Sequence, residues 1–426
     1  MNVAIAGYGI EGKANLEYWR AQGHDVTVLD EREVQDVPEG VVKITGPQAF
    51  QDLEEYDVVV RTASLRPDKL GGAQVVWSAT NEFFAECPAT IIGVTGTKGK
   101  GTTSSLIAAM LRAAGKKVHL VGNIGVPALS ELPNIAKDDI VVYELSSFQL
   151  WDLENSPHIA VVLMIEPDHL DVHTSFEEYL AAKANIVAHQ ALDDRVVFCR
   201  DNQYSLAIAQ QSEACAFIPY QDEEFAHVVD DTFYYGDLVV CSTSALQLPG
   251  AHNQDNACAA IGAVWELLGG NVAAIEHGLQ SFTGLPHRLK FIREVNDVEY
   301  YDDSIATTPG SAIAAICSFD QPKLVILGGS EKGTTYDEVI EVCRQTKTGI
   351  IAIGQTGEKI HRQAQAAGVE SHRVLGDMHE VVAKAYALAK PGSVVILCPA
   401  SASFDQYKNY TDRGDQFIAA LDRLAA

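Results

Sequence analysis

The chain of 426 residues lacks the signals of a disulfide-bonded, zinc-binding or membrane-spanning protein. Its eight cysteines lie singly, with no C-x-x-C pair, so neither a disulfide framework nor a zinc knuckle is indicated. No apolar run approaches the roughly 18 residues that a membrane span needs. The first residues, MNVAIAGYGIEGK, have the pattern of a strand and a turn, without the basic segment and cleavage site of a signal peptide. We therefore expect a cytoplasmic protein with no membrane association.

Positive charge is also scarce. The chain has 31 Lys and Arg residues against 57 Asp and Glu residues, a net charge of −26. A surface this negative repels phosphate backbones, which argues against nucleic acid as a partner. Anionic small molecules can bind only where lysines, arginines, metal ions and backbone N–H groups gather locally. The length predicts two to four domains of roughly 100–200 residues each.

The most informative stretch that is present is IIGVTGTKGKGTT, residues 91–103. Its pattern is a buried strand, a glycine-rich turn and the start of a helix. Gly96, Gly99 and Gly101 allow backbone N–H groups to point inward at a helix N-terminus, where the dipole favours an anion, and Lys100 adds a mobile positive charge. We interpret this loop as a nucleoside-triphosphate site, although its hydroxyls, at Thr102 and Thr103, come one place later than in the general P-loop.

Residues 1–89 have the pattern of a small doubly wound α/β unit, with strands near 41–44, 57–61 and 74–77 following a first βαβ. Gly7, Gly9 and Gly12 have G-x-G-x-x-G spacing, and the second strand ends at Asp30. A dinucleotide site is one interpretation. We favour a cradle for uridine diphosphate or a similar nucleotide diphosphate, because the unit is short and because of the motifs that come later in the chain.

The second unit, residues 90–286, contains a predicted strand over 140–150, IVVYELSSFQL, with Glu144 near its end. A carboxylate on a strand beside a phosphate loop is where nucleotide-bound Mg²⁺ finds a protein ligand. A further strand over 159–173 ends in a cluster of Asp168, His169, Asp171 and His173, and a helical stretch carries Lys183 fourteen residues after His169. Histidine with carboxylates suits a second divalent metal. Asn253 and Asn256 cluster at the entrance of a later helix, as caps or as contacts to adenine or ribose.

The third unit, residues 287–426, again alternates strands with helices, which implies a parallel sheet with ligands at its carboxyl edge. Arg288 offers a planar cation in the linker before it. Lys332, Ser403 and Tyr410 lie in predicted loops after strands. We expect these three residues to form a pocket for a small anionic acceptor.

Several motifs together resemble the Mur ligase family over essentially the whole chain. They are the G-T-x-G-K loop, ELSSFQL, DHLD with a lysine fourteen residues later, FTGLPHR, and DQYKNYTDRG. The resemblance implies an α/β fold of three domains: a Rossmann-like domain over 1–89 for the UDP-sugar, a P-loop ATPase-like parallel sheet over 90–286 for ATP, and a Rossmann-like domain over 287–426 for the amino acid. The most similar type within the family joins D-glutamate to UDP-N-acetylmuramoyl-L-alanine, through an acyl phosphate, in peptidoglycan precursor synthesis. We expect such a ligase to act as a monomer.

The resemblance also implies roles for individual residues. Lys100 would hold the β- and γ-phosphates, Thr102 and Glu144 would bind a first Mg²⁺, and His169 with a carbamylated Lys183 would bind a second. These four, Lys100, Glu144, His169 and Lys183, are the implied catalytic residues. ATP would be bound by Gly96, Thr97, Lys98, Gly99, Lys100, Gly101, Thr102, Thr103, Asn253, Asn256, Arg288, Asp303 and Thr307. The UDP-sugar and glutamate would be bound by Gly9, Ile10, Asp30, Asn123, Ser146, Gln149, Lys332, Ser403, Phe404 and Tyr410.

Some positions depart from the family pattern and keep alternatives open. Gly101 stands where this type usually has Ser or Thr, Ile305 stands where many members have Lys, and Ser330 replaces an acidic residue. RTASLRP, residues 61–67, stands where an SPG-like turn is common. A related ligase that uses L-glutamate and a folylpolyglutamate-synthase-like ligase are the alternatives within this chemistry. A nicotinamide-dependent oxidoreductase would leave Lys100, Glu144 and Lys183 without a role, and a P-loop switch would hydrolyse ATP without an acceptor.

Overall fold

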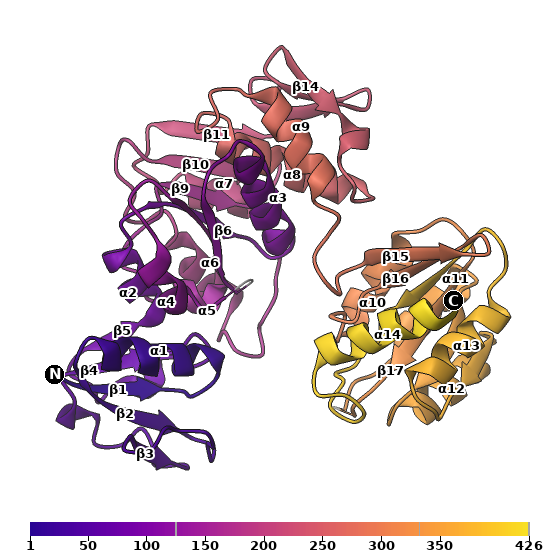
Figure 1. Ribbon diagram of the computed structural model, residues 1–426, viewed down its shortest axis with the longest axis horizontal. Helices are drawn as coiled ribbons and strands as arrows, with labels where there is room; N and C mark the ends of the chain where they lie inside the picture. The colour runs from indigo at the N-terminus through magenta and orange to yellow at the C-terminus, as the bar shows by residue number, and fades with distance from the viewer. Residues whose placement is uncertain (124–125, 332, 425–426) are drawn as a thin grey trace. The chain divides into compact units, whose positions relative to one another are not determined.

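The computed structural model describes residues 1–123, 126–331 and 333–424. The chain packs into two compact units, which are described separately (Figure 1). Unit 1 comprises Met1–Gln247 and Ala251–Phe282, and unit 2 comprises Leu248–Gly250 and Thr283–Ala426. The predicted boundary at residue 89 lies inside unit 1, and the division of unit 1 into two domains stays a prediction. Within the described part of the chain, every helix is too short or too polar to cross a membrane.

The first sheet of unit 1 is parallel, in the order β3-β2-β1-β4-β5. The turn after β1, residues 7–12, contains Gly7, Gly9 and Gly12 and is called the glycine turn below. Position 12 requires glycine, because a Cβ there would lie 2.0 Å from the carbonyl oxygen of Gly7. The predicted strands are confirmed to within two residues. The elements are β1 (Asn2–Ala6), α1 (Ile10–Ala21), β2 (Asp25–Asp30), β3 (Val42–Thr45), β4 (Val58–Arg61), β5 (Val76–Ser78) and α2 (Ala79–Glu86), with single turns of 3₁₀ helix at Leu53–Glu55 and Pro67–Leu70.

The second sheet of unit 1 is also parallel, in the order β11-β10-β9-β6-β8-β7. Because β6 lies between β8 and β9, the chain segments that come after those two strands flank the glycine-rich loop after β6. The sheet contains β6 (Thr90–Thr95), β7 (Val118–Gly122), β8 (Ile140–Glu144), β9 (Ile159–Val162), β10 (Arg195–Cys199) and β11 (Ala216–Tyr220). The helices are α3 (Lys100–Ala113), α4 (Ala128–Glu131), α5 (Ser147–Leu150), α6 (Phe176–Ala184), α7 (Gln203–Ala209), α8 (Ala251–Val264) and α9 (Val272–Ser281).

Two of the predicted strands in this sheet are shorter than expected. The strand predicted over 140–150 ends at Glu144, and a short helix, α5, comes next. Ser146 caps this helix, since its hydroxyl accepts from the Gln149 N–H while the Gln149 side chain accepts from the Ser146 N–H. The strand predicted over 159–173 ends at Val162. The apolar run continues to Ile165, but of its last three residues only Leu163 and Ile165 are buried, and Met164 is exposed.

A three-stranded antiparallel sheet in unit 1 was not predicted. It consists of β12 (Ala226–Val229), β13 (Thr232–Tyr235) and β14 (Leu238–Ser242), joined by tight turns. The turn between β12 and β13 places Asp230 and Asp231 at positive φ. Strands of four or five residues with half-exposed side chains have too weak an alternation to be read from sequence.

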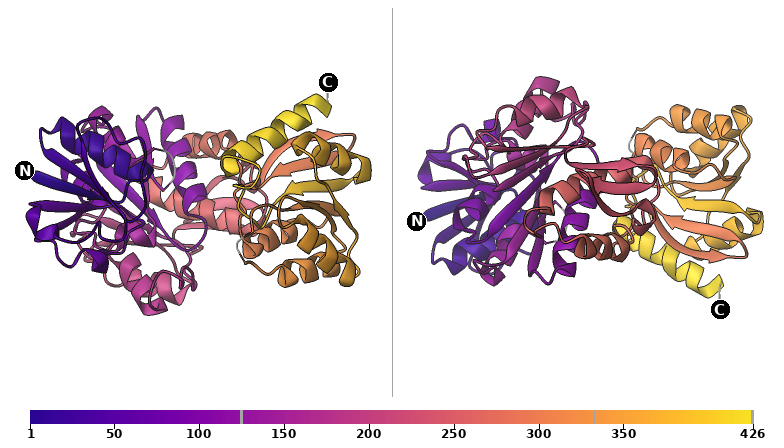
Figure 2. Two further views of the ribbon diagram at one scale, coloured as in Figure 1. Left: turned by 90° about the horizontal axis from the view of Figure 1, so that it is seen from below. Right: turned by 90° about the horizontal axis from the view of Figure 1, so that it is seen from above.

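Unit 2 has one sheet in the order β15-β16-β20-β17-β18-β19, parallel apart from the β15–β16 hairpin. Two hydrophobic clusters cover its faces, one with α10, α11 and α12 and the other with α13 and α14, and Figure 2 shows α14 as the yellow helix beside this sheet. The strands are β15 (Lys290–Val295), β16 (Val298–Asp302), β17 (Lys323–Gly328), β18 (Gly349–Ile353), β19 (Ser371–Arg373) and β20 (Ser393–Leu397). The helices are α10 (Pro309–Cys317), α11 (Asp337–Gln345), α12 (Gly357–Ala366), α13 (Met378–Leu388) and α14 (Tyr410–Leu424). The predicted α/β fold class is confirmed in both units.

Candidate active site

The glycine-rich loop joins the carboxyl end of β6 to the N-terminus of α3, as predicted. Gly99 is the N-cap of α3 at φ 83°, and a Cβ there would lie 2.2 Å from Oδ1 of Asn256. A Cβ at Gly96 would lie 2.6 Å from Cβ of Leu163. Both positions therefore require glycine, because neighbouring atoms occupy the space of a side chain. The first N–H groups of α3 face the loop, which gives it the geometry of an anion site.

Two lysine amines meet at one carbonyl oxygen of this loop. Lys100 Nζ donates to the carbonyl of Gly96 at 3.0 Å and to that of Thr97 at 3.0 Å. Lys183 Nζ donates to the same Gly96 carbonyl at 2.8 Å and to the hydroxyl of Thr95 at 3.2 Å. Lys183 comes from α6, so the structure brings together two residues that are 83 positions apart in sequence (183 − 100). By contrast, Lys98 forms an exposed ion pair with Glu166 at 2.5 Å.

The surroundings of Lys183 disfavour its charged form. Its side chain is 1% exposed, and burial, reinforced by the charge of Lys100, lowers the pKa of the Lys183 ammonium well below its ordinary value. The amine also lies 4.7 Å from the ring centre of Tyr179, one turn earlier on α6. Tyr179 in turn contacts the loop, because its hydroxyl lies 2.9 Å from the hydroxyl of Thr97. Sequence reasoning missed Tyr179 and Thr95, although the i, i+4 spacing of Tyr179 and Lys183 was a usable signal.

Glu144 ends β8 beside the loop strand, where it pairs in register with Val94 of β6. Its carboxylate is buried and accepts a hydrogen bond from Nδ2 of Asn123 at 3.0 Å. Thr102 is buried in the first turn of α3. One carboxylate and one hydroxyl beside a phosphate loop suit Mg²⁺, which keeps waters and takes phosphate oxygens as further ligands. The structure thus places Asn123 and Glu144 together, as expected for the edge of one sheet.

The predicted cluster of two histidines and two aspartates is only partly assembled. His169 is exposed at φ 55° and lies 3.7 Å from the Asp168 carboxylate. His173 instead turns into the core, where it stacks on Phe148 and its Nε2 lies 2.9 Å from the Ser147 hydroxyl. Its surroundings are aromatic, so the loop after β9 buries this residue. Over the residues described, no three His, Cys, Asp or Glu side chains gather closely enough to hold a metal ion by themselves.

The other residues predicted for unit 1 lie at ends of its strands and helices. Asn256 of α8 donates to Asn253 at 3.2 Å and accepts from the Thr103 hydroxyl at 3.4 Å, so both asparagines belong to the loop surroundings. In the first sheet, Gly9 is the N-cap of α1 and Ile10 is exposed. Asp30, at the end of β2, accepts from the Tyr8 N–H at 2.8 Å.

In unit 2 the most perturbed predicted residue is Asp303, which comes directly after β16. Burial raises the pKa of its carboxyl to about 7, against the opposing effects of the Leu289 N–H and the Arg288 charge. Ser403 is buried, whereas Phe404 and Tyr410 are exposed. Thr307 lies in the turn before α10, and Lys332 lies outside the described residues.

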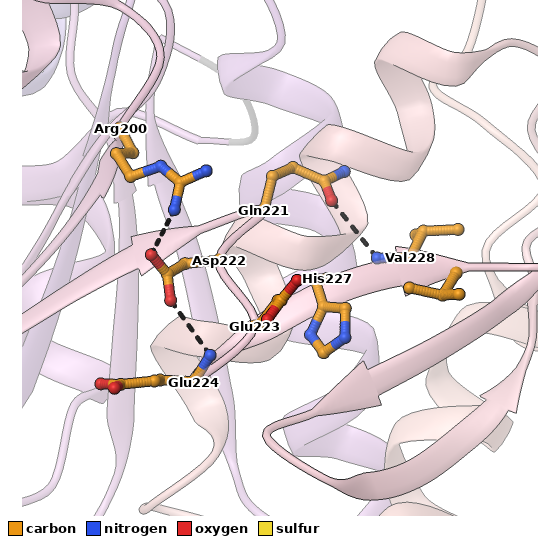
Figure 3. A pocket seen from close by; sticks show the side chains of 8 residues that line it. Arg200, Gln221, Asp222, Glu223, Glu224, His227 and Val228 are labelled. Atoms are coloured by element: carbon orange, nitrogen blue, oxygen red, sulfur yellow. Dashed lines mark hydrogen bonds and ion pairs between the residues drawn. The ribbon is translucent and has the colours of Figure 1, made fainter.

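An open hollow of about 450 Å³ lies where the chain passes from β11 to β12 (Figure 3). Asp222, which lines it, pairs with Arg200 at 2.5 Å. Gln221 lines it too and donates to Asp255 of α8 at 2.7 Å. Three acidic side chains, Asp222, Glu223 and Glu224, make this hollow unsuited to a triphosphate.

Comparisons with known proteins extend these observations to the whole chain. Residues 94–264 match the Mur ligase middle domain, and residues 287–401 match the family described as Mur ligase, glutamate ligase domain. The chain is 36% identical to the UDP-N-acetylmuramoylalanine–D-glutamate ligase of Acetivibrio thermocellus, over 100% of this chain and 97% of the relative. It is 34% identical to the ligase of the same name from Symbiobacterium thermophilum, over 99% and 98%.

Solved structures share the fold at lower identity. UDP-N-acetylmuramate-alanine ligase MurC of Thermotoga maritima superimposes with a TM-score of 0.61 at 18% identity, over 100% of both chains. The MurF ligase of Thermotoga maritima in complex with ADP gives a TM-score of 0.58 at 18% identity, over 99% of this chain and 95% of the other. These likenesses support the arrangement of strands and helices described above.

Proposed function

Since the chain belongs to the Mur ligase family, we propose that it uses ATP to join D-glutamate to UDP-N-acetylmuramoyl-L-alanine, a step of peptidoglycan precursor synthesis. The observation that carries this proposal is the loop after β6, where a glycine turn at a helix N-terminus meets two lysine amines at the Gly96 carbonyl. Full-length relatives that bear the name of this ligase support the choice of substrates.

The proposed reaction has two steps that share one phosphate-binding loop. An oxygen of the alanyl carboxylate attacks the γ-phosphorus of ATP, the bond to the β-phosphate oxygen breaks, and ADP and an acyl phosphate form. The neutral amine of glutamate then attacks the acyl carbon, inorganic phosphate leaves, and the amine loses a proton as the amide forms. The N–H groups at the start of α3 and the Lys100 ammonium stabilise the negative charge on the transferring group.

We propose that divalent cations bind at two positions beside the loop. Thr102 and Glu144 would hold one Mg²⁺, and His169 and Lys183 would hold the other. Bound there, Mg²⁺ would neutralise phosphate charge during transfer. Glu144 suits this role because it is buried and its Oε1 takes its hydrogen bond from a neutral amide, that of Asn123.

Lys183 supports a second metal only after a chemical change. A protonated amine repels a cation. In its neutral form the Lys183 amine can form an N–C bond to CO₂ and lose one proton to solvent, which gives an anionic carbamate whose oxygen suits Mg²⁺. The burial that lowers the lysine pKa is therefore what makes carbamylation possible.

The remaining residues are assigned to substrates in the order of the sheets along the chain. We propose that the first sheet binds the uridine diphosphate through Gly9, Ile10 and Asp30, and that Asn123, Ser146 and Gln149 line the muramoyl channel. Asn253 and Asn256 in unit 1, and Arg288, Asp303 and Thr307 in unit 2, would contact ATP, and Lys332, Ser403, Phe404 and Tyr410 would bind glutamate.

Phosphate release tests the proposed function directly. The purified chain is incubated with ATP, Mg²⁺ and UDP-N-acetylmuramoyl-L-alanine, and phosphate is measured with D-glutamate, with L-glutamate and without an amino acid. We expect release that requires both the UDP-sugar and D-glutamate. Release that requires L-glutamate would assign the chain to the related ligases, and release that is indifferent to the UDP-sugar would refute the substrate assignment.

A further inference from the structure

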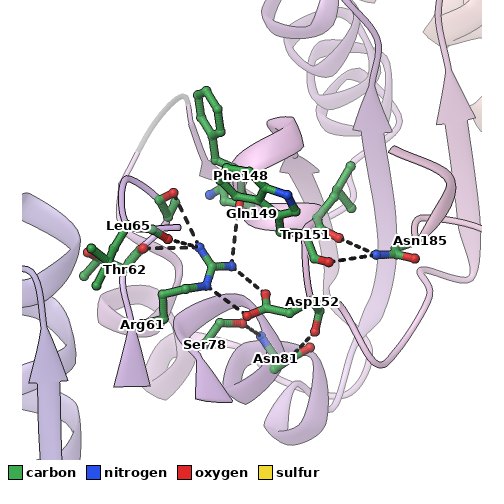
Figure 4. A network of polar contacts seen from close by, with 12 residues as sticks. Arg61, Thr62, Leu65, Ser78, Asn81, Phe148, Gln149, Trp151, Asp152 and Asn185 are labelled. Carbon is green, nitrogen blue, oxygen red and sulfur yellow. Dashed lines mark hydrogen bonds and ion pairs between the residues drawn. The ribbon is translucent and has the colours of Figure 1, made fainter. Parts of the chain in front are cut away.

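Arg61, the last residue of β4, is a fully buried arginine between the first and second sheets of unit 1 (Figure 4). Its Nε and Nη2 donate to the two carboxylate oxygens of Asp152, at 2.9 and 2.5 Å, and Nη2 also donates to the carbonyl of Phe148 at 3.1 Å. Phe148 lies in α5, and Asp152 lies two residues after the end of that helix. A two-pronged pair of this kind fixes direction as well as distance.

The remaining nitrogen of Arg61 organises the loop after β4. Nη1 contacts the carbonyl oxygens of Thr62, Ala63 and Leu65, at 3.3, 3.5 and 3.0 Å. The five N–H groups of an arginine are thereby all directed at protein acceptors. Arg61 is thus engaged in holding the protein together and has no N–H left for a substrate phosphate.

The loop that Arg61 holds packs directly on the glycine turn of the first sheet. The hydroxyl of Thr62 donates to the carbonyl of Ala6 at 3.0 Å, and the Ala63 N–H donates to Glu11 at 2.6 Å. A Cβ at Gly7 would lie 2.2 Å from the Thr62 hydroxyl. The loop is therefore in direct contact with the glycine turn on one side and with Arg61 on the other.

On the other side, the segment around α5 is held at several points. Asn81 Nδ2 donates to the Asp152 carbonyl at 2.8 Å, and Asn185 Nδ2 donates to the carbonyls of Leu150 and Trp151 at 2.8 and 3.1 Å. This segment begins with the capping box of Ser146 and Gln149. A displacement at Asp152 would be transmitted to those two side chains, because α5 is a single helical turn.

A second arginine of the same loop supports the contact. Arg66 Nη1 donates to the carbonyl of Val172 at 2.6 Å and Nη2 donates to Glu178 at 3.0 Å, while its guanidinium lies 5.0 Å from the ring centre of Trp151. Glu178 belongs to α6, the helix that carries Lys183. Arg61 at the end of β4 and Arg66 in the loop that follows thus reach the segment around α5 and the helix α6 of the second sheet.

We propose that Arg61, acting through Asp152, is a positioning residue that sets the spacing between the two halves of the UDP-sugar site, with Arg66 as its second point of attachment. The glycine turn would hold the nucleotide end, and Ser146 and Gln149 would meet the muramoyl end. One substrate must satisfy both halves, so a change in their spacing weakens its binding. This inference rests on the proposed function of the chain.

The test compares KM values for the three substrates in the full chain. Arg61→Met should raise the KM for UDP-N-acetylmuramoyl-L-alanine by about tenfold or more and change the KM for ATP by less than about twofold. The matched control is Arg195→Met, which removes a partly exposed arginine that pairs with Glu266 on the surface of unit 1. The control should keep all three KM values.

A double variant separates positioning from simple loss of stability. Arg61→Met leaves the Asp152 carboxylate without its partner and is expected to lower the melting temperature, whereas Arg61→Met/Asp152→Leu removes both charges and should recover much of it. We expect the KM for the UDP-sugar to stay raised in the double variant. A stable double variant with a wild-type KM would overturn the proposal and leave the pair a purely structural role.

Arg61→Lys keeps the test decisive if the other variants do not fold. Lysine retains the charge but lacks the two-pronged geometry, so we expect a folded protein with a severalfold higher KM for the UDP-sugar. An unchanged KM in this variant would also overturn the proposal. Wild-type phosphate release that depends on the UDP-sugar tests the proposed function independently, so the two failures are distinguishable.

Discussion

The amine of Lys183 gives the sharpest prediction at the scale of one residue. Loss of a residue that only supports a metal ligand reduces activity by roughly 10- to 100-fold. Lys183 is proposed to be a ligand itself, so Lys183→Ala should reduce the rate of phosphate release by more than that. Short carboxylic acids added to the variant should restore part of the activity, because their carboxylate can replace the carbamate oxygens.

The control for this experiment is Lys137→Ala, which removes an exposed lysine of unit 1. It should retain wild-type activity and show no response to added acids. A Lys183→Ala variant with normal activity would contradict the role of Lys183, and an inactive variant that no acid restores would contradict the carbamate.

The pH dependence of stability in unit 2 depends on Asp303. Its pKa is raised to about 7 in the folded chain, whereas an unfolded aspartate titrates near 3.9, so between these values the folded state binds more protons. The free energy of unfolding should therefore fall as the pH rises from about 4 to about 7, by up to about 4 kcal/mol, and level off above that.

Asp303→Asn should abolish this slope, because the amide keeps the shape and carries no charge at any pH. Urea-dependent hydrogen exchange of the β16 amides, measured at pH 5 and pH 8, reports the difference. Asp320→Asn, at an exposed position of unit 2, should retain the wild-type slope. A slope that persists in Asp303→Asn would show that another group causes it.

At the scale of an element, the start of α3 depends on glycine. Gly99→Ala should raise the KM for ATP by about tenfold or more, because the methyl group would displace Asn256, which lies 2.2 Å from the Cβ position. Gly115→Ala, just after the end of α3, is the matched control. Gly115 has a similar φ of 78° but open space around it.

The two glycine variants separate backbone strain from collision. Gly115→Ala should lose about 1–2 kcal/mol of stability and keep its KM for ATP. Fluorescent nucleotide binding and steady-state kinetics measure both effects. Equal changes in the KM for ATP would show that strain in the backbone, and not the contact with Asn256, controls the loop.

Elements with strong patterns were predictable from sequence, and the rest were not, for physical reasons. The apolar strands beside the glycine-rich loop, and Glu144 at the end of one of them, could be read from local sequence. α5 was missed because a single capped turn after a strand has no helical periodicity to detect. The burial of His173 depends on Phe148 and Ser147, residues more than twenty positions away, so no local pattern could separate it from His169.

At the scale of the whole molecule, the chain should unfold in two steps. Each unit has its own sheets and hydrophobic core, three sheets in unit 1 and one in unit 2, so calorimetry without ligands should resolve two transitions. ATP with Mg²⁺ should raise the temperature of the transition of unit 1, which carries the glycine-rich loop. An unchanged transition of unit 1 would contradict the proposed nucleotide site.

The ion pair of buried Arg61 and partly exposed Asp152 also constrains how this sequence can change over time. Losing Asp152 alone leaves the buried Arg61 charge without its carboxylate, whereas losing both partners relieves that cost in stability but not the proposed cost in substrate binding. A mutation at either position therefore lowers stability, substrate binding or both. Among descendants of this chain the two positions, 91 residues apart, should be inherited together or replaced together.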